Sequence, residues 1–185
     1  MNYLRRSFVT ALGLALVGCG GGSDNKPSLV IFGESHARRW ADDNPQTLTR
    51  WDFINRGIGG ETTDRGLRRI PEALALKPDL FVLWQGGNDA IQFDNLNEDN
   101  YRAMLILMRD SGVPSLALTI PQIYRDLREN AASIRVAKAQ RRLAAEVGVP
   151  LFDVEPIVDR SLFLDDLLHL NAAGYAKVSR SLGWM

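Results

Sequence analysis

Short apolar runs alternate along the chain with longer segments in which apolar residues recur every three or four positions. The runs are bounded by turn residues, as buried β-strands are, and the longer segments have the period of helices that cover a sheet. The five predicted strands are residues 29–32, 53–55, 80–84, 115–119 and 150–152. The predicted helices are residues 63–76, 98–111, 133–147 and 172–182, the last with Asn171 as its N-cap.

This alternation predicts an α/β domain in three layers, α/β/α, around a five-stranded, mainly parallel sheet. We expect the flavodoxin-like strand order, in which the second strand precedes the first and the third, fourth and fifth follow. In such open sheets ligands bind at the carboxyl ends of the strands, near the point where the order reverses. The loops after the first three strands should therefore lie together and form the functional site.

The amino-terminal segment has a different pattern. Arg5 and Arg6 precede an apolar stretch, residues 8–17, that is too short to span a bilayer and is typical of a cleavable export signal. The four residues 16–19, Leu-Val-Gly-Cys, resemble the bacterial lipobox, whose cysteine becomes the lipidated first residue of the mature protein. The alternatives are an ordinary signal peptide with an incidental cysteine and a buried helix. The paired arginines fit either general or twin-arginine export.

We therefore expect a signal peptide over residues 1–18, a flexible tether over 19–27 and a folded domain over 28–185. Cys19 is the only cysteine, so its use as a membrane anchor leaves no disulfide. The expected location is the periplasmic face of the cell envelope. Gly20 stands where inner-membrane lipoproteins carry a retention aspartate, which favours the outer membrane.

Composition narrows the possible functions. A chain of 185 residues that is 45% hydrophobic can bury one sizeable core. The 22 basic and 22 acidic residues balance, so no electrostatic footprint for nucleic acid is present. The sequence has two histidines far apart, no cluster with metal-ligand spacing and no phosphate-binding loop with a following lysine. We therefore expect neither a metal nor a cofactor.

Candidate chemistry lies directly after the first three predicted strands, in the stretches GESH (33–36), NRGIGGETT (55–63) and QGGNDA (85–90). Ser35 could be a helix N-cap or a nucleophile, and the glycines could be ordinary turn residues. Acyl transfer at Ser35 would need donors for the developing oxyanion. The amides of Ser35 and Gly60 and the carboxamide of Asn88 could supply them.

A nucleophilic serine also needs a base, and His169 is the better candidate of the two histidines. His36 adjoins Ser35, and neighbouring side chains on a tight turn diverge. Asp166 precedes His169 by three residues, a spacing that in a turn lets its carboxylate bond to Nδ1 of the ring. That bond would fix the tautomer and leave Nε2 for Ser35.

The three stretches and residues 166–169, in this order, resemble the four sequence blocks of the SGNH (GDSL) hydrolases. The resemblance is to the small bacterial esterases of the multifunctional thioesterase and lysophospholipase type in particular. The resemblance covers nearly the whole expected domain. It implies that Ser35 is the nucleophile, His169 the base and Asp166 its orienting residue, with Ser35, Gly60 and Asn88 as the oxyanion hole. Two positions depart from the family pattern: Glu34 replaces the usual aspartate, and Leu170 replaces the proline that often follows the histidine.

The resemblance implies a serine esterase that cleaves short to medium acyl esters, thioesters or lysophospholipids without a cofactor. Two alternatives remain: an O-acetylesterase acting on envelope polysaccharide, and a catalytically idle lipoprotein that binds acyl groups. The acyl pocket is expected between residues 90–96 and 121–130 and beside the histidine. Its predicted lining residues are Ile91, Phe93, Ile123, Tyr124, Leu168 and Leu170.

Overall fold

The computed structural model describes residues 26–185, so the predicted signal peptide, Cys19 and most of the tether lie outside the described part. The five strands are β1 (Ser28–Gly33), β2 (Asp52–Gly57), β3 (Leu80–Trp84), β4 (Ser115–Leu118) and β5 (Leu151–Phe152). They form one parallel sheet in the order β2-β1-β3-β4-β5. The predicted fold class and strand order are confirmed.

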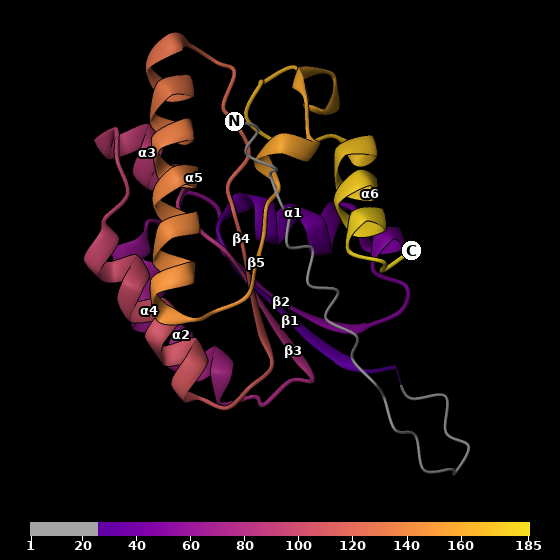
Figure 1. Cartoon of the computed structure of the whole chain (residues 1–185). Helices are drawn as coiled ribbons and strands as arrows, with labels where there is room; N and C mark the ends of the chain where they lie inside the picture. The colour runs from indigo at the N-terminus through magenta and orange to yellow at the C-terminus, as the bar shows by residue number, and fades with distance from the viewer. Residues whose placement is uncertain (1–25) are drawn as a thin grey trace, which may run out of the picture.

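The helices form a layer on each face of the sheet (Figure 1). One layer contains α2 (Thr63–Leu74), α3 (Gly87–Phe93), α4 (Glu98–Asp110) and α5 (Leu127–Val147). The other contains α1 (Ser35–Asp43) and α6 (Ala172–Ser181). Residues 26–185 also contain three short 3₁₀ segments, at Pro45–Thr47, Glu155–Ile157 and Arg160–Leu162.

Alternate residues of the strands pack into two separate hydrophobic cores, one on each face of the sheet. In β1, Val30 and Phe32 join the core under α2, α4 and α5, whereas Leu29 and Ile31 join the core under α1 and α6. All four side chains are fully buried. A strand covered on both faces can be apolar throughout, which explains why the predicted strands appear as continuous apolar runs.

Helices α2, α4 and α6 begin where predicted and end one or two residues earlier, and three larger differences remain. Helix α5 begins six residues earlier than predicted, because the side chain of Asp126 caps it by accepting from the amide of Glu129 at 2.8 Å. The short helices α1 and α3 were not predicted, since each begins within a glycine-rich polar stretch and offers few apolar residues. The N-cap predicted for the last helix is confirmed, with Asn171 Oδ1 accepting from the amide of Gly174 at 3.0 Å.

Candidate active site

The end of β1 places Ser35 at the carboxyl edge of the sheet. Gly33 has φ +145°, and a Cβ there would lie 1.9 Å from the carbonyl oxygen of Trp84. Only glycine fits this close approach of two strands. Ser35 is the first residue of α1, Glu34 occupies the N-cap position, and neither side chain caps the helix. The half-buried hydroxyl of Ser35 points instead to a histidine.

Ser35, His169 and Asp166 form one chain of hydrogen bonds although the serine lies 134 residues from the histidine. Asp166 Oδ2 lies 2.7 Å from His169 Nδ1, and His169 Nε2 lies 2.9 Å from Ser35 Oγ. Because a carboxylate accepts, Nδ1 carries the proton, and Nε2 is free to accept from the serine hydroxyl. The geometry matches the spacing argument made from the sequence.

A tight turn holds the Asp166 carboxylate against the ring of His169. Asp166 Oδ1 accepts from the amides of Leu168 and His169 at 3.0 and 2.9 Å. Phe163 and Leu170 pair as an antiparallel bridge across the base of the turn. Leu167 has φ +52°, a left-handed conformation that costs a branched residue free energy, so the surrounding bonds must hold the turn in place.

The electrostatics of the pair suit a neutral histidine beside an ionised carboxylate. Burial raises the pKa of Asp166, but the hydrogen bonds from the ring of His169 and from the two backbone amides outweigh it and lower this pKa to about 2. Burial lowers the pKa of His169 below its usual value, and the nearby His36 and Arg39 act in the same direction against the raising effect of Asp166. The ring is therefore neutral near pH 7 and able to accept a proton.

Gly60 lies on the exposed loop that follows β2, with φ +76°. The loop is anchored by the next residue, the buried Glu61. Arg69 donates to the carboxylate of Glu61 from Nε at 2.7 Å and from one terminal nitrogen at 2.5 Å. The backbone carbonyl of Glu61 accepts from Gln85 at 2.8 Å and from Asn88 at 3.1 Å. The Gly60 loop is thus joined to the loop that carries Asn88.

Asn88 is held by the carboxyl group of Glu34, a residue that is 1% exposed. Glu34 Oε2 accepts from the backbone amide of Asn88 at 2.9 Å and from its Nδ2 at 2.7 Å, while Oε1 accepts from the amide of Gly87 at 3.0 Å. A Cβ on Gly87 would lie 2.4 Å from Glu34 Oε1, so glycine is required there. Both hydrogens of Asn88 Nδ2 are engaged, one by Glu34 and one by Glu61.

The sequence prediction missed the structural roles of Glu34 and His36, the two neighbours of Ser35. Glu34 holds the Asn88 loop as just described. His36 is 2% exposed, its ring lies 5.6 Å from that of His169 between centroids, and its Nε2 lies 3.1 Å from the carbonyl oxygen of Leu168. Both residues were visible beside Ser35 in the sequence. The contacts of Glu34 with residues 53 and 54 positions away, and of His36 with a residue 132 positions away, were not.

Two of the predicted pocket residues are buried, which corrects that part of the prediction. Ile123 is 1% exposed and belongs to the core under α5, while Leu170 is 2% exposed and belongs to the core under α6. Ile123 turns inward because its amide donates to the hydroxyl of Ser133 on α5. Neither side chain can line an open pocket.

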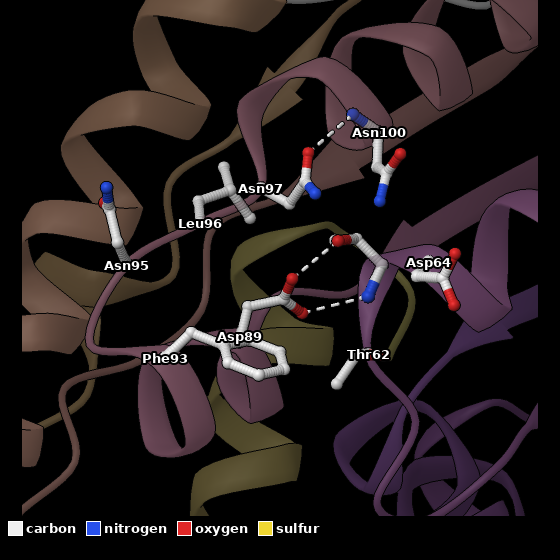
Figure 2. Close-up of a pocket in the computed structure, with 9 residues that line it drawn as sticks. Thr62, Asp64, Asp89, Phe93, Asn95, Leu96, Asn97 and Asn100 are labelled. Carbon is white, nitrogen blue, oxygen red and sulfur yellow. Dashed lines mark hydrogen bonds between the residues drawn. The ribbon is translucent and has the colours of Figure 1, made fainter.

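The other four predicted pocket residues are spread over the same edge of the sheet. Ile91 packs against the core beneath α3, and Leu168 is half-buried beside His169. Tyr124 is half-buried with its ring edge-on to Phe163, and its amide donates to Leu167. Phe93 is 63% exposed at the end of α3 and lines a separate pocket with Asp89 (Figure 2).

Comparisons with known proteins identify the family of the chain and agree with its fold. The family model for the GDSL-like lipase/acylhydrolase family matches residues 17–177. The chain therefore belongs to the GDSL-like lipase/acylhydrolase family, a family of esterases and acylhydrolases, as the sequence motifs predicted. A comparison with curated proteins finds no match.

Solved structures share the fold. A catalytic mutant of an acetylxylan esterase from Geobacillus stearothermophilus superposes with a TM-score of 0.72 at 16% identity, over 85% of this chain and 93% of that one. A GDSL-like lipase from Bacteroides thetaiotaomicron gives 0.72 at 21% identity, over 85% and 86%. An alpha/beta hydrolase from the metagenome of Lake Arreo, Spain, gives 0.65 at 21% identity, over 85% and 94%.

No three His, Cys, Asp or Glu side chains within residues 26–185 lie close enough together to hold a metal ion. No helix of the same region is both long enough and apolar enough to cross a membrane.

Proposed function

We propose that the chain hydrolyses carboxylic esters through an acyl-enzyme on Ser35. The observation that carries the proposal is the continuous hydrogen-bonded chain from Asp166 through His169 to Ser35 Oγ, at 2.7 and 2.9 Å. In this proposal His169 is the general base and Asp166 orients it. The half-buried, neutral ring accepts the hydroxyl proton as Oγ attacks, then returns it to the departing alcohol.

The oxyanion would be bound by the amides of Ser35 and Gly60 and by the carboxamide of Asn88. Within the described residues no hydrogen bond occupies the amide of Gly60, which is ready to donate. Asn88 Nδ2 must first release one partner. The bond to the Glu61 carbonyl, at 3.1 Å, is longer than the bond to Glu34, at 2.7 Å, so it is the one that substrate would replace.

Water then attacks the acyl-enzyme with His169 again as base, and Ser35 is regenerated. Once Ile123 and Leu170 are assigned to the cores, the half-buried Leu168 and Tyr124 remain at the turn that carries His169, because the amide of Tyr124 donates to the carbonyl of Leu167. A small apolar surface of this kind favours short to medium acyl groups, in oxygen esters, thioesters or lysophospholipids. Acylated polysaccharide is a second candidate, favoured by a pocket that Phe93 lines together with several Asn and Thr side chains.

Hydrolysis of p-nitrophenyl esters from acetate to laurate, by the protein and by its Ser35→Ala variant, tests this function. Turnover by the protein that disappears in the variant supports Ser35 as the nucleophile. The acyl-chain length with the highest kcat/KM gives the length that the acyl site prefers. Equal rates in both proteins, or no turnover by the folded protein across the whole series, would overturn the esterase proposal.

The membrane partner is a separate proposal, which rests on the sequence alone. Lipidation of Cys19 would tether the domain to the periplasmic face of the envelope, with the outer membrane favoured, and keep the enzyme near envelope esters. Labelling of cells with a palmitate analogue tests it. The label should be incorporated by the natural chain and lost in Cys19→Ala, and equal labelling of both would contradict the anchor.

A further inference from the structure

A pocket of about 470 Å³ opens beside the proposed oxyanion hole and has no role in the mechanism above. It lies between the first turns of α2 and α4 and the end of α3 (Figure 2). Its volume is within the range of small-molecule sites in proteins. The nine residues that line it are Thr62, Thr63, Asp64, Asp89, Phe93, Asn95, Leu96, Asn97 and Asn100.

The pocket shares its wall with the catalytic site. Asp89 follows Asn88, and Thr62 follows Glu61, whose carbonyl accepts from Asn88. Buried Asp89 joins α3 to the first turn of α2, because its carboxylate accepts from the amide and hydroxyl of Thr63 at 2.9 and 2.5 Å. A substrate whose ester group lies at Ser35 can therefore extend over this wall into the pocket.

The exposed lining is aromatic and polar, without a positive charge. Phe93 presents a phenyl ring that is 63% exposed, while the other apolar residue, Leu96, is 4% exposed. Within residues 26–185 no hydrogen bond occupies the carboxamides of Asn95 and Asn100 or the hydroxyl of Thr62. Figure 2 shows Asn97 and Asn100 above the gap and the ring of Phe93 beside Asp89 below it.

This combination selects among ligand classes. An acyl chain needs a continuous apolar surface, and the pocket offers one exposed ring among polar groups. An anion such as a phosphate is disfavoured by Asp64 and Asp89 and by the absence of a basic residue from the nine. A neutral sugar fits both features: its hydroxyls pair with amide and hydroxyl groups, and its apolar C–H face packs on an aromatic ring.

We propose that this pocket is a carbohydrate subsite, which binds sugar residues next to the one whose ester group is attacked at Ser35. The substrate class is then an acylated oligosaccharide or polysaccharide. The inference rests on the proposed esterase function, because the pocket would bind the sugar part of the substrate, which leaves as the alcohol when Ser35 is acylated. Phe93 serves as the stacking surface, and Asn97 and Asn100 recognise hydroxyl groups.

Binding can be tested apart from catalysis in the Ser35→Ala protein. Neutral trisaccharides without ester groups (xylotriose, cellotriose and chitotriose) are titrated at millimolar concentration while the side-chain amide resonances of Asn95, Asn97 and Asn100 are followed by NMR. At least one trisaccharide should shift these resonances, and the added Phe93→Ala change should weaken its binding about five- to tenfold. If no trisaccharide shifts them, the subsite is overturned.

Kinetics test the same inference in the active protein. The quantity compared is the ratio of kcat/KM for an O-acetylated trisaccharide to kcat/KM for p-nitrophenyl acetate. In Phe93→Ala this ratio should fall about five- to tenfold, mainly through a higher KM for the trisaccharide. The matched control is Leu127→Ala, which removes an exposed apolar side chain at the start of α5 and should leave the ratio unchanged. An unchanged ratio in Phe93→Ala, or a selective loss on p-nitrophenyl laurate, would overturn the carbohydrate assignment.

The two proposals fail in distinguishable ways. If the protein hydrolyses no ester but binds a trisaccharide at the three asparagines, the esterase function fails and the subsite stands. If Ser35-dependent hydrolysis is observed but no trisaccharide binds and the ratio of kcat/KM values is unchanged, the esterase function stands and the subsite fails.

Discussion

His36 Nε2 lies 3.1 Å from the carbonyl oxygen of Leu168, the residue that precedes His169. Since a carbonyl only accepts, the ring of His36 donates this hydrogen bond from a site that is 2% exposed. The other ring nitrogen, Nδ1, has no hydrogen-bond partner among the described residues and lies 3.6 Å from Glu34 Oε1. The side chain next to the nucleophile therefore holds the turn that carries the proposed base.

The His36→Phe variant tests this positioning role. Phe keeps the packing against Trp84 but leaves the Leu168 carbonyl without its donor, so His169 should lose its alignment with Ser35. We expect kcat to fall by up to about a hundredfold with little change in KM. His36→Gln, which retains an N–H donor, should recover part of the loss. Equal kcat values for His36→Phe and the parent would show that the contact does not position His169.

Glu34 is the counterpart of His36 on the other side of Ser35. Glu34→Gln keeps the size of the side chain but presents an N–H group to a site filled with the donors of Gly87 and Asn88. We expect a loss of about 1–3 kcal/mol in the free energy of unfolding and a lower kcat, because Asn88 is no longer held. Chemical denaturation and ester hydrolysis measure the two effects.

The control for this change is Glu72→Gln on the exposed face of α2, which should leave both quantities unaltered. Glu34→Asp is the second informative variant, because the shorter side chain cannot reach Gly87 and Asn88 with both oxygens from the same backbone position. Full kcat in Glu34→Asp would contradict the idea that the longer residue is needed here.

The fold was predictable because its signals are local. Each strand of the sheet is a short apolar run between turn residues, and the amphipathic period identified four of the six helices. The start of α5 was missed because its first turn breaks the amphipathic pattern: the apolar Leu127 is exposed and the polar Glu129 is buried. Only the cap at Asp126 defines the boundary. The helices α1 and α3 are too short for a periodic pattern to be distinguished from a turn.

The hydrogen bond between Asp166 and His169 was predictable for a different reason, namely that the two residues are close in sequence and their bond needs only a turn. The contacts of Glu34 and His36 were not predictable, since they join residues 53, 54 and 132 positions apart. The burial of Ile123 was missed as well, because an apolar residue in a loop has the same local signal whether it faces a pocket or the core. Such distinctions depend on tertiary packing.

The pH dependence of activity follows from the lowered pKa of His169. The neutral ring is the base, so activity should rise with pH through this pKa and stay constant above it, with a midpoint below 6.5 because burial opposes protonation. In Asp166→Asn the raising effect of the carboxylate is lost, so the midpoint should move to still lower pH. The kcat should fall about 10³- to 10⁴-fold, because the amide no longer fixes the tautomer.

Asp165→Asn is the matched control, since it makes the same change one position earlier at an exposed side chain. Profiles of kcat/KM from pH 4.5 to 8.5 give both midpoints. A profile that is flat over this range, or a midpoint for Asp166→Asn above that of the parent, would contradict the assignment of His169 as the base oriented by Asp166.

The ion pair between Arg69 and Glu61 should support catalysis through the Gly60 loop. Arg69 contacts both carboxylate oxygens of Glu61, donates to the carbonyl of Arg56 at 3.2 Å and lies over the ring of Phe32 at 4.6 Å. Removal of the guanidinium leaves the buried Glu61 carboxylate without its cation, and the backbone that carries the Gly60 amide loses its anchor.

We therefore expect Arg69→Ala to lower the free energy of unfolding by about 2 kcal/mol, or Tm by about 4–8 °C, and to reduce kcat more than it changes KM. Arg69→Lys should restore the charge but not the two-point grip, so its kcat should lie between those of the parent and Arg69→Ala. Arg65→Ala, an exposed change on the same helix, serves as the control. If Arg69→Ala loses stability but keeps full kcat at a temperature where it is folded, the ion pair stabilises the fold only, and the Gly60 amide is held in place by the contacts of the Glu61 carbonyl.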